Sequence, residues 1–215
     1  KGRLWLDQGG VYVVANLRGG GEYGEDWHRA GNLTRKQNVF DDLAACARRL
    51  VEARYTSAPK LAIEGGSNGG LLMGAVMTQR PELFGAVVSH VGVYDMLRSE
   101  LSPNGSFNVP EYGTVKDPTQ FAAMYAYSPY HHVKDGVAYP PILLPAGAND
   151  PRVDPMQSRK MAARLQAATA GKSLVLLRAS ATSGHGIGTA LDERIGLEAD
   201  VWAFLFAQLG VPVKK

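Results

Sequence analysis

The sequence runs Leu61-Ala62-Ile63-Glu64-Gly65-Gly66-Ser67-Asn68-Gly69-Gly70 at the point that decides its fold. The short apolar run at its start predicts a strand, and the apolar run 71–77 that follows predicts a helix. The Gly-x-Ser-x-Gly pattern between them predicts a strained turn that holds the hydroxyl of Ser67 clear of the backbone. We expect Gly65 and Gly69 to be required, because a Cβ at either position would meet the neighbouring strand or helix.

An acidic residue and a histidine follow this serine in the order that an α/β-hydrolase requires. The buried-strand pattern 141–146 leads into a turn-rich loop that carries Asp150. A helical stretch and a further strand then lead to a loop in which His185 lies between two glycines. Each residue therefore falls just after a predicted strand, and the pattern predicts a catalytic triad of Ser67, His185 and Asp150.

This triad predicts hydrolysis through an acyl-enzyme intermediate, with no cofactor and no metal. Ser67 would attack a carbonyl carbon, His185 would accept and return the proton, and Asp150 would orient the imidazole ring. The backbone N–H of Asn68, directly after the nucleophile, would donate a hydrogen bond to the developing oxyanion.

The composition is that of one globular domain: 215 residues, 45% hydrophobic and 20% charged, with a net charge of +3. No block of like charges indicates binding to nucleic acid, and no apolar run approaches the ~18 residues that span a membrane. We therefore expect a soluble protein of the cytoplasm or the periplasm, whose compartment the sequence leaves unknown. Cys46 is the only cysteine, which excludes a disulfide within the chain, and its place on a helix predicts a buried structural thiol.

Strands and helices alternate along the chain, which predicts an α/β fold with a mostly parallel sheet covered by helices on both faces. A long irregular stretch, 95–130, is expected to form one wall of the substrate site. Asn38 is the expected N-cap of the first helix. The predicted strands are 11–17, 61–64, 86–91, 142–146 and 174–178, and the predicted helices are 40–53, 70–78, 156–169 and 192–208.

The chain resembles the catalytic domain of the prolyl oligopeptidases, a family of α/β-hydrolase serine peptidases. The resemblance extends over essentially all 215 residues. Asn68 after the serine is similar to the branch of the family that cuts after proline. The most distinctive shared blocks are Asn16-Leu-Arg-Gly-Gly-Gly-Glu-Tyr-Gly24, Gly65-Gly-Ser-Asn-Gly-Gly-Leu71, Val91-Gly-Val-Tyr-Asp-Met-Leu97, Asn149-Asp-Pro-Arg-Val153 and Gly184-His-Gly186.

The resemblance implies that oligopeptides are the substrates and that Arg152 hydrogen-bonds a peptide carbonyl of the substrate. It also implies a β-propeller domain that restricts access, and a second oxyanion donor from a tyrosine upstream. We expect residues 1–215 to be the α/β-hydrolase catalytic domain of a longer protein, with the propeller, the leading strands and that tyrosine outside them. Tyr23 is expected to line the substrate site, where it would contact substrate or pack in the wall.

One position departs from the family. The resemblance implies a tryptophan that stacks on the substrate proline, and Asn108 stands there, beside Phe107. An amide offers no comparable flat apolar face. Phe107 could substitute only if the loop is rearranged. A peptidase acting after proline is the prediction, and two alternatives stay open: an esterase-like hydrolase of relaxed specificity, and an inactive fragment that needs a partner segment.

Two other patterns favour different sites and are set aside. The segment 19–24 fits Gly-x-Gly-x-x-Gly, but the residues after it are polar and interrupted by Gly31, whereas a dinucleotide site needs a helix packed on the sheet. His131 and His132 have no cluster of other ligands at metal-binding spacing, so they are expected to be structural or solvent-exposed.

Overall fold

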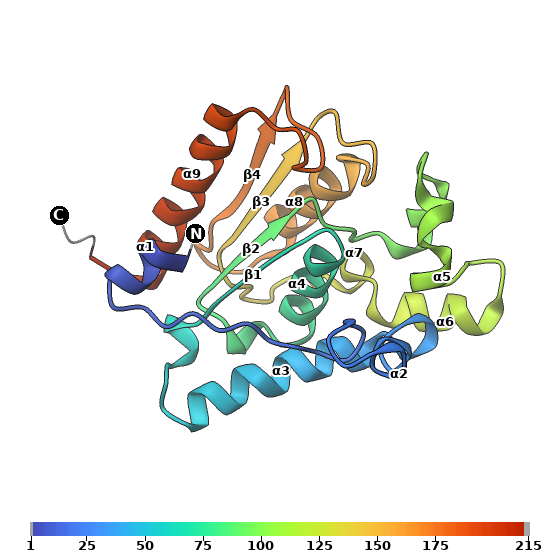
Figure 1. The fold of residues 1–215 in the computed structure, drawn as a ribbon, viewed down its shortest axis with the longest axis horizontal. Helices are drawn as coiled ribbons and strands as arrows, with labels where there is room; N and C mark the ends of the chain where they lie inside the picture. The colour runs from blue at the N-terminus through green and yellow to red at the C-terminus, as the bar shows by residue number, and fades with distance from the viewer. Residues whose placement is uncertain (1, 213–215) are drawn as a thin grey trace.

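A computed structural model of the chain describes residues 2–212, and a four-stranded parallel sheet lies at its centre (Figure 1). The strands follow one another across the sheet in chain order. Each connection between them therefore returns over a face of the sheet, as parallel pairing requires. The strands are β1 (Ala62–Gly66), β2 (Ala86–His90), β3 (Ile142–Gly147) and β4 (Val175–Ser180).

Alternating residues of the strands feed two separate cores. Ile63 pairs with Val87, Val87 with Ile142, and Ile142 with Val175, which forms an apolar row across one face. The next residues along β2 and β3, such as Val88, turn to the opposite face. A sheet with apolar side chains on both faces must be covered on both, which confirms the predicted α/β class.

Helices cover the two faces unequally (Figure 1). On one face α4 (Asn68–Gln79) and α8 (Met156–Ala168) pack on the strands, and α3 (Gln37–Glu52) packs against α4. On the other face lies α9 (Leu191–Leu209), where Trp202 stacks 5.9 Å from Trp5 of α1 (Gly2–Asp7). The short helices are α2 (Glu25–Arg29), α5 (Val109–Tyr112), α6 (Pro118–Tyr127), α7 (Pro129–His132), η1 (Leu33–Arg35), η2 (Ala58–Lys60), η3 (Pro81–Leu83), η4 (Met96–Leu101) and η5 (Gly105–Asn108).

The prediction of a strand over 11–17 is wrong. The segment crosses the molecule without regular structure, and Val11 to Val14 are each more than half exposed. A strand is held by hydrogen bonds to a neighbour, and within residues 2–212 the sheet ends at β1 without pairing to this segment.

Three smaller expectations also need correction. Lys36, and not Asn38, precedes α3; Asn38 is the second residue of the helix, and its side chain donates to the carbonyl of Ala30 at 2.7 Å. The stretch 95–130 is not irregular but a chain of short helices, η4 to α7. Cys46 is half-buried, and burial together with the negative charge of Asp42 raises the pKa of its thiol.

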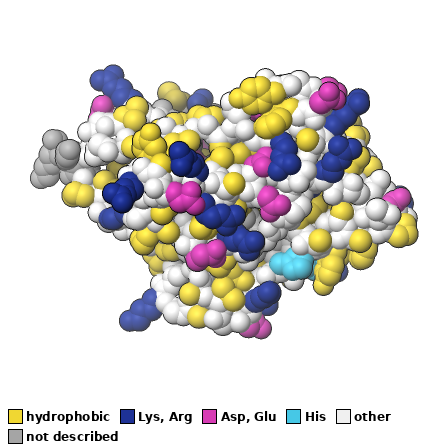
Figure 2. All heavy atoms as spheres, turned by 90° about the horizontal axis from the view of Figure 1, so that it is seen from below, with side chains coloured by type: hydrophobic (Ala, Val, Ile, Leu, Met, Phe, Trp, Pro, Cys, Tyr) yellow, Lys and Arg dark blue, Asp and Glu magenta, His cyan; other side chains and the backbone are white. Residues whose placement is uncertain are grey.

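On the face drawn in Figure 2, basic and acidic side chains are interspersed among apolar ones. Among the residues that the structure describes, no helix combines the length and hydropathy needed to cross a bilayer.

Candidate active site

Ser67 lies alone in the turn between the end of β1 and the start of α4. Its φ of 59° is a conformation that residues other than glycine rarely adopt. Two hydrogen bonds hold it there: its N–H donates to the carbonyl of His90 at 2.9 Å, and its carbonyl accepts from the N–H of Leu71 at 3.0 Å. The serine is thus fixed in a strained turn at the carboxyl end of the sheet.

The glycines around this turn differ in what they make possible. A Cβ at Gly65 would lie 2.6 Å from the carbonyl oxygen of Gly69, so Gly65 is required as predicted. A Cβ at Gly69 would meet no atom within 4 Å, so that half of the prediction is wrong. Gly70 takes the role instead, since its Cβ would lie 2.5 Å from the Cα of Gly92.

Asp150 and His185 meet across two loops at the same end of the sheet. His185 Nδ1 lies 2.7 Å from Asp150 Oδ2, and both side chains are almost completely buried. The other carboxylate oxygen, Oδ1, accepts from the backbone N–H groups of Arg152 at 2.8 Å and Val153 at 2.9 Å. Asp150 is therefore held from both sides and presents one oxygen to the imidazole.

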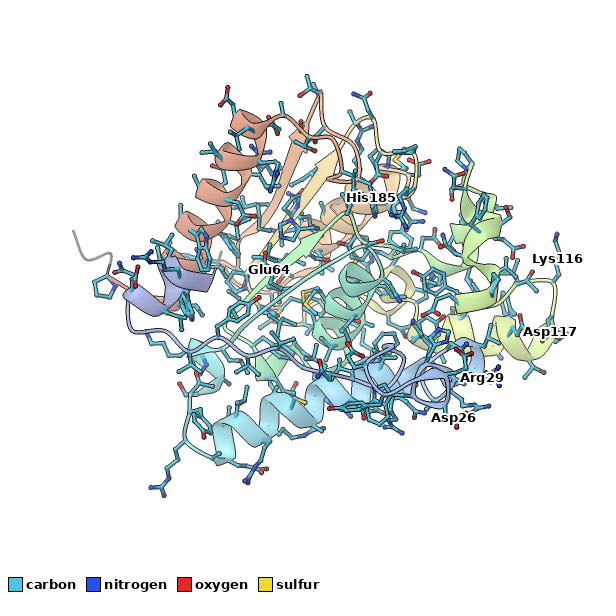
Figure 3. The ribbon with its side chains drawn as sticks, in the orientation of Figure 1. Asp26, Arg29, Glu64, Lys116, Asp117 and His185 are labelled. Atoms are coloured by element: carbon cyan, nitrogen blue, oxygen red, sulfur yellow. The ribbon has the colours of Figure 1, made fainter. Side chains whose placement is uncertain are left out.

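Backbone contacts join the acid loop to the histidine loop. The N–H of Ala148 donates to Ser180 at 2.8 Å, and the N–H of Asn149 donates to Ser183 at 3.1 Å. A Cβ at Gly184 would lie 3.1 Å from the carbonyl oxygen of Asn149, so glycine lets the loops approach closely. Figure 3 shows the resulting position of His185, near the arrowheads of the central strands.

The structure brings some of the predicted residues together and leaves others apart. Ser67 and His185 line one groove, and His185 and Arg152 line a second groove beside it. Asn108, Phe107 and Tyr23 line neither. The side chain of Phe107 is 82% exposed on η5, and Tyr23 is exposed and packs edge-on against Trp27, with ring centroids 5.1 Å apart.

Asn68, the predicted oxyanion donor, is the first residue of α4. Backbone N–H groups in the first turn of a helix have no acceptor within the helix, and the positive end of the helix dipole lies there. The arrangement suits binding of a negatively charged oxygen. The side-chain amide of Asn68 donates to Glu111 Oε1 at 3.1 Å.

The sequence prediction missed the polar group that receives this amide. Glu111 Oε2 lies 2.9 Å from His28 Nε2, and Glu111 Oε1 also accepts from the ammonium of Lys36. Lys36 is 2% exposed, although lysine side chains usually lie at the surface. The contacts join residues 43 to 83 positions apart, a distance at which no local pattern indicates contact.

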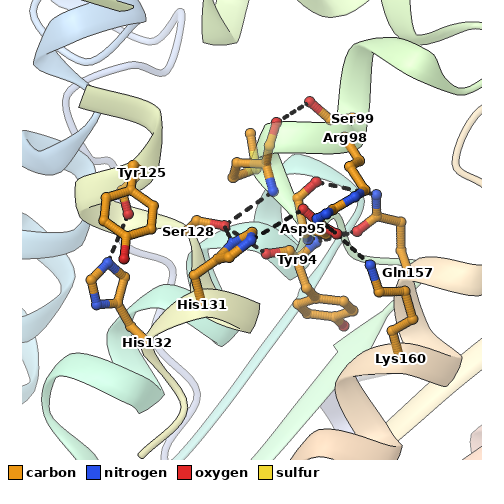
Figure 4. A network of polar contacts seen from close by, with 11 residues as sticks. Tyr94, Asp95, Arg98, Ser99, Tyr125, Ser128, His131, His132, Gln157 and Lys160 are labelled. Atoms are coloured by element: carbon orange, nitrogen blue, oxygen red, sulfur yellow. Dashed lines mark hydrogen bonds and ion pairs between the residues drawn. The ribbon is translucent and has the colours of Figure 1, made fainter. Parts of the chain in front are cut away.

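A second polar network anchors the segment 95–132 to α8 (Figure 4). Buried Asp95 forms an ion pair with Lys160 of α8, and the Gln157 side chain accepts from the backbone N–H of Asp95 at 2.7 Å. Ser128 bridges to His131 Nδ1 at 2.8 Å. The same segment reaches the acid loop through Asn104, whose amide donates to the carbonyl of Pro151.

The two histidines set aside as metal ligands have other partners. His131 contacts Ser128, and His132 Nε2 lies 2.7 Å from the carbonyl oxygen of Tyr125. Among residues 2–212 no group of three or more histidine, cysteine or acidic side chains could hold a metal ion.

Comparison with known proteins identifies the family. A model of the prolyl oligopeptidase family matches residues 2–212. A prolyl endopeptidase of Dictyostelium discoideum is 46% identical over 205 residues, which are 94% of this chain and 27% of that protein. The chain thus spans less than a third of the length of this curated relative.

Solved structures agree with the sequence comparison. One from a study of two prolyl endopeptidases is 53% identical, has a TM-score of 0.94, and is matched over 97% of this chain and 31% of that chain. A post-proline cleaving enzyme from Rickettsia typhi is 35% identical, also with a TM-score of 0.94, over 98% of this chain and 30% of that one. These similarities confirm the α/β-hydrolase fold.

Proposed function

Since the chain belongs to the prolyl oligopeptidase family, we propose that residues 1–215 form the catalytic domain of a serine peptidase that hydrolyses oligopeptides after proline. The observation that carries the proposal is the buried 2.7 Å contact between His185 and Asp150, at a groove that Ser67 also lines. The names of the relatives, prolyl endopeptidase and post-proline cleaving enzyme, support the substrate class.

The proposed reaction uses this geometry in two steps. In the first step the Ser67 oxygen attacks the peptide carbonyl carbon, and the His185 imidazole accepts the serine proton and passes it to the leaving amine. In the second step water attacks the acyl-enzyme, and the imidazole again accepts and returns a proton. Asp150 keeps Nδ1 engaged, which leaves the other ring nitrogen for the serine.

The oxyanion that forms in each step needs donors already in place. We assign one to the backbone N–H of Asn68, because it lies at the start of α4 beside the nucleophile. Arg152 lines the groove next to His185, where its planar guanidinium could bind a substrate carbonyl.

Further polypeptide is part of the proposal. The relatives are more than three times as long as the part of them that this chain matches. We propose that a β-propeller and leading strands of the same protein restrict entry to the groove and supply the second oxyanion donor.

One observation favours a second candidate, an esterase-like hydrolase of relaxed specificity. Asn108 stands where an aromatic ring would stack on proline, and the exposed Phe107 lines neither groove near the triad. Comparing hydrolysis of a peptide with proline before the scissile bond, its alanine counterpart, and a short aryl ester separates the two candidates.

The test of the proposal is covalent labelling with a fluorophosphonate, followed by intact mass. We expect one adduct on the parent chain, no adduct on Ser67→Ala, and labelling of Asp150→Asn and His185→Ala slowed by up to ~10⁴-fold. Circular dichroism of each variant controls for folding. A folded parent that takes no label would refute catalysis by this chain alone and favour the alternative of a fragment that needs a partner segment.

A further inference from the structure

Glu111 connects three segments that lie far apart in the sequence. Its carboxylate receives the amide of Asn68 from the nucleophile turn, the ammonium of Lys36 from the turn before α3, and the ring of His28 from α2. We call these residues the Glu111 cluster. Asn68 is the only member next to the nucleophile, so the carboxylate can influence the reaction through that residue.

The Lys36–Glu111 pair is too buried to be an ordinary surface ion pair, whereas Asn68 is an exposed residue held at the edge of the cluster. Lys36 is 2% exposed, and the Glu111 side chain is 23% exposed. Burial raises the pKa of the Glu111 carboxyl, but the Lys36 ammonium and the hydrogen bonds from Lys36, His28 and Asn68 outweigh it and lower the pKa. Glu111 is therefore a carboxylate at neutral pH, and a carboxylate accepts stronger hydrogen bonds than a neutral group does.

The position of Glu111 in α5 gives the contact a second consequence. α5 continues directly from η5, which ends at Asn108, the residue in the proposed specificity position. Lys36 also lies over the ring of buried Tyr112, 5.3 Å from its centroid. The cluster thus fixes the segment that carries Asn108 relative to the turn that carries Ser67.

We propose that Glu111 is a positioning residue for the active site, which holds Asn68 so that its backbone N–H points at the oxyanion. The proposal rests on the proposed function, since it assigns the Asn68 N–H to the oxyanion. Glu111 itself does not contact the reacting atoms. It acts by fixing the Asn68 side chain, and so the rotation of the peptide that bears the donor. Misplacing a catalytic group by about 1 Å costs on the order of 10²-fold in rate.

The experiment compares variants that separate positioning from stability. Glu111→Leu with Lys36→Met removes the acceptor and leaves no buried charge unpaired, whereas Glu111→Gln with Lys36→Met keeps an oxygen acceptor. Asn68→Ala removes the amide and keeps the backbone N–H. Asp42→Asn is the matched control: it breaks the partly buried ion pair of Asp42 with Arg18, which has no contact with the cluster.

Two readouts are measured on each variant together with its thermal midpoint. One is the rate constant of fluorophosphonate labelling at Ser67, and where peptide turnover is measurable, kcat and KM separately. The other is deuterium uptake of the backbone in a peptide spanning 65–72, with a peptide from α9 as reference. The second readout does not depend on activity.

We expect Glu111→Leu/Lys36→Met and Asn68→Ala each to slow labelling by at least tenfold, to lower kcat more than they raise KM, and to increase uptake in 65–72 only. Combining them should add nothing further, because both changes remove the same contact. Glu111→Gln/Lys36→Met should recover most of the lost rate, and Asp42→Asn should change only the thermal midpoint.

The outcomes distinguish this inference from the proposed function. A parent that takes no label, with uptake in 65–72 still raised by the variants, refutes catalysis by this chain alone and supports the part of the inference that Glu111 holds the nucleophile turn in place. Unchanged uptake, or a labelled parent whose rate the variants do not alter, overturns the positioning role. Losses that simply add in the combined variant overturn it as well, since they would arise from separate contacts.

Discussion

Replacing Gly65 by alanine should displace the start of α4, and with it the nucleophile turn, from the strand β1. The new Cβ would lie 2.6 Å from the carbonyl oxygen, 2.9 Å from the carbonyl carbon and 3.3 Å from the Cα of Gly69. These are all backbone atoms, so no side-chain rotation relieves the overlap. Ordinary contact begins at 3.4 Å, so the first turn of α4 must move by roughly 0.8 Å. Overpacking of this kind costs about 1–3 kcal/mol, and a shift of that size at Ser67 costs on the order of 10²-fold in rate.

Gly69→Ala is the matched control, since it adds the same methyl group at the other glycine of the Gly-x-Ser-x-Gly pattern, four residues along the chain. No atom lies within 4 Å of its Cβ, and the residue belongs to the first turn of α4. Replacing glycine by alanine at an unstrained helical position stabilises by about 0.4–1 kcal/mol. The assay is urea unfolding followed by tryptophan fluorescence, together with the rate of fluorophosphonate labelling. The reasoning is refuted if Gly65→Ala unfolds at the parent midpoint, or if Gly69→Ala destabilises as much as Gly65→Ala does.

Two further predictions concern the segment 95–132. Burial lowers the pKa of His131 below its usual 6.5. Burial raises the pKa of Asp95, but the hydrogen bond and charge of Lys160 outweigh it and leave that pKa below 3.8. Both groups therefore contribute stability above these values and lose it as the pH falls. The free energy of unfolding, measured by urea unfolding, should therefore decrease as the pH falls below 6.5. His131→Asn should flatten this dependence on pH just below 6.5, and Asp95→Asn should flatten it below 3.8. Variants whose unfolding free energy falls with pH in parallel with the parent would contradict this. Asn108→Trp should raise the ratio of kcat/KM for a proline peptide to kcat/KM for its alanine counterpart by about 2–10-fold, because aromatic packing adds ~0.5–1.5 kcal/mol. An unchanged ratio would mean that residues elsewhere bind the proline.

Most of the fold could be predicted because its signals are local. The apolar runs of β1 to β4 report burial on both faces, and the long helices α3, α4, α8 and α9 show their own apolar periodicity, so these eight elements were found within a few residues of their true ends. The short helices of the segment 95–132 were not. The segment 11–17 shows the limit of this approach. Its apolar pattern indicates a strand that would be buried, but a strand also needs a hydrogen-bonded neighbour, and no property of the seven residues specifies one.

The candidate site, too, was predictable in its order of residues and not in its tertiary contacts. Ser67, Asp150 and His185 each follow a strand, so the fold itself brings their loops to one edge of the sheet, and the order of residues was enough to group them. The room around the glycines was not predictable to the same degree, since Gly65 and Gly69 look alike in sequence and differ only in what lies opposite them. A motif therefore specifies the turn, while the tertiary contacts decide which of its glycines is essential.

Glu111 and Lys36 show why the groups around a site are harder to predict than the reactive groups themselves. Neither its sequence neighbours nor those of Lys36 predict burial, because acidic and basic residues usually lie at the surface and an unpaired buried charge is costly. The cost disappears only when the two groups meet, and they meet because α3, α5 and the nucleophile turn pack together. Residues of this kind depend on the assembled fold, so sequence patterns find the groups that perform chemistry more readily than the groups that hold them in place.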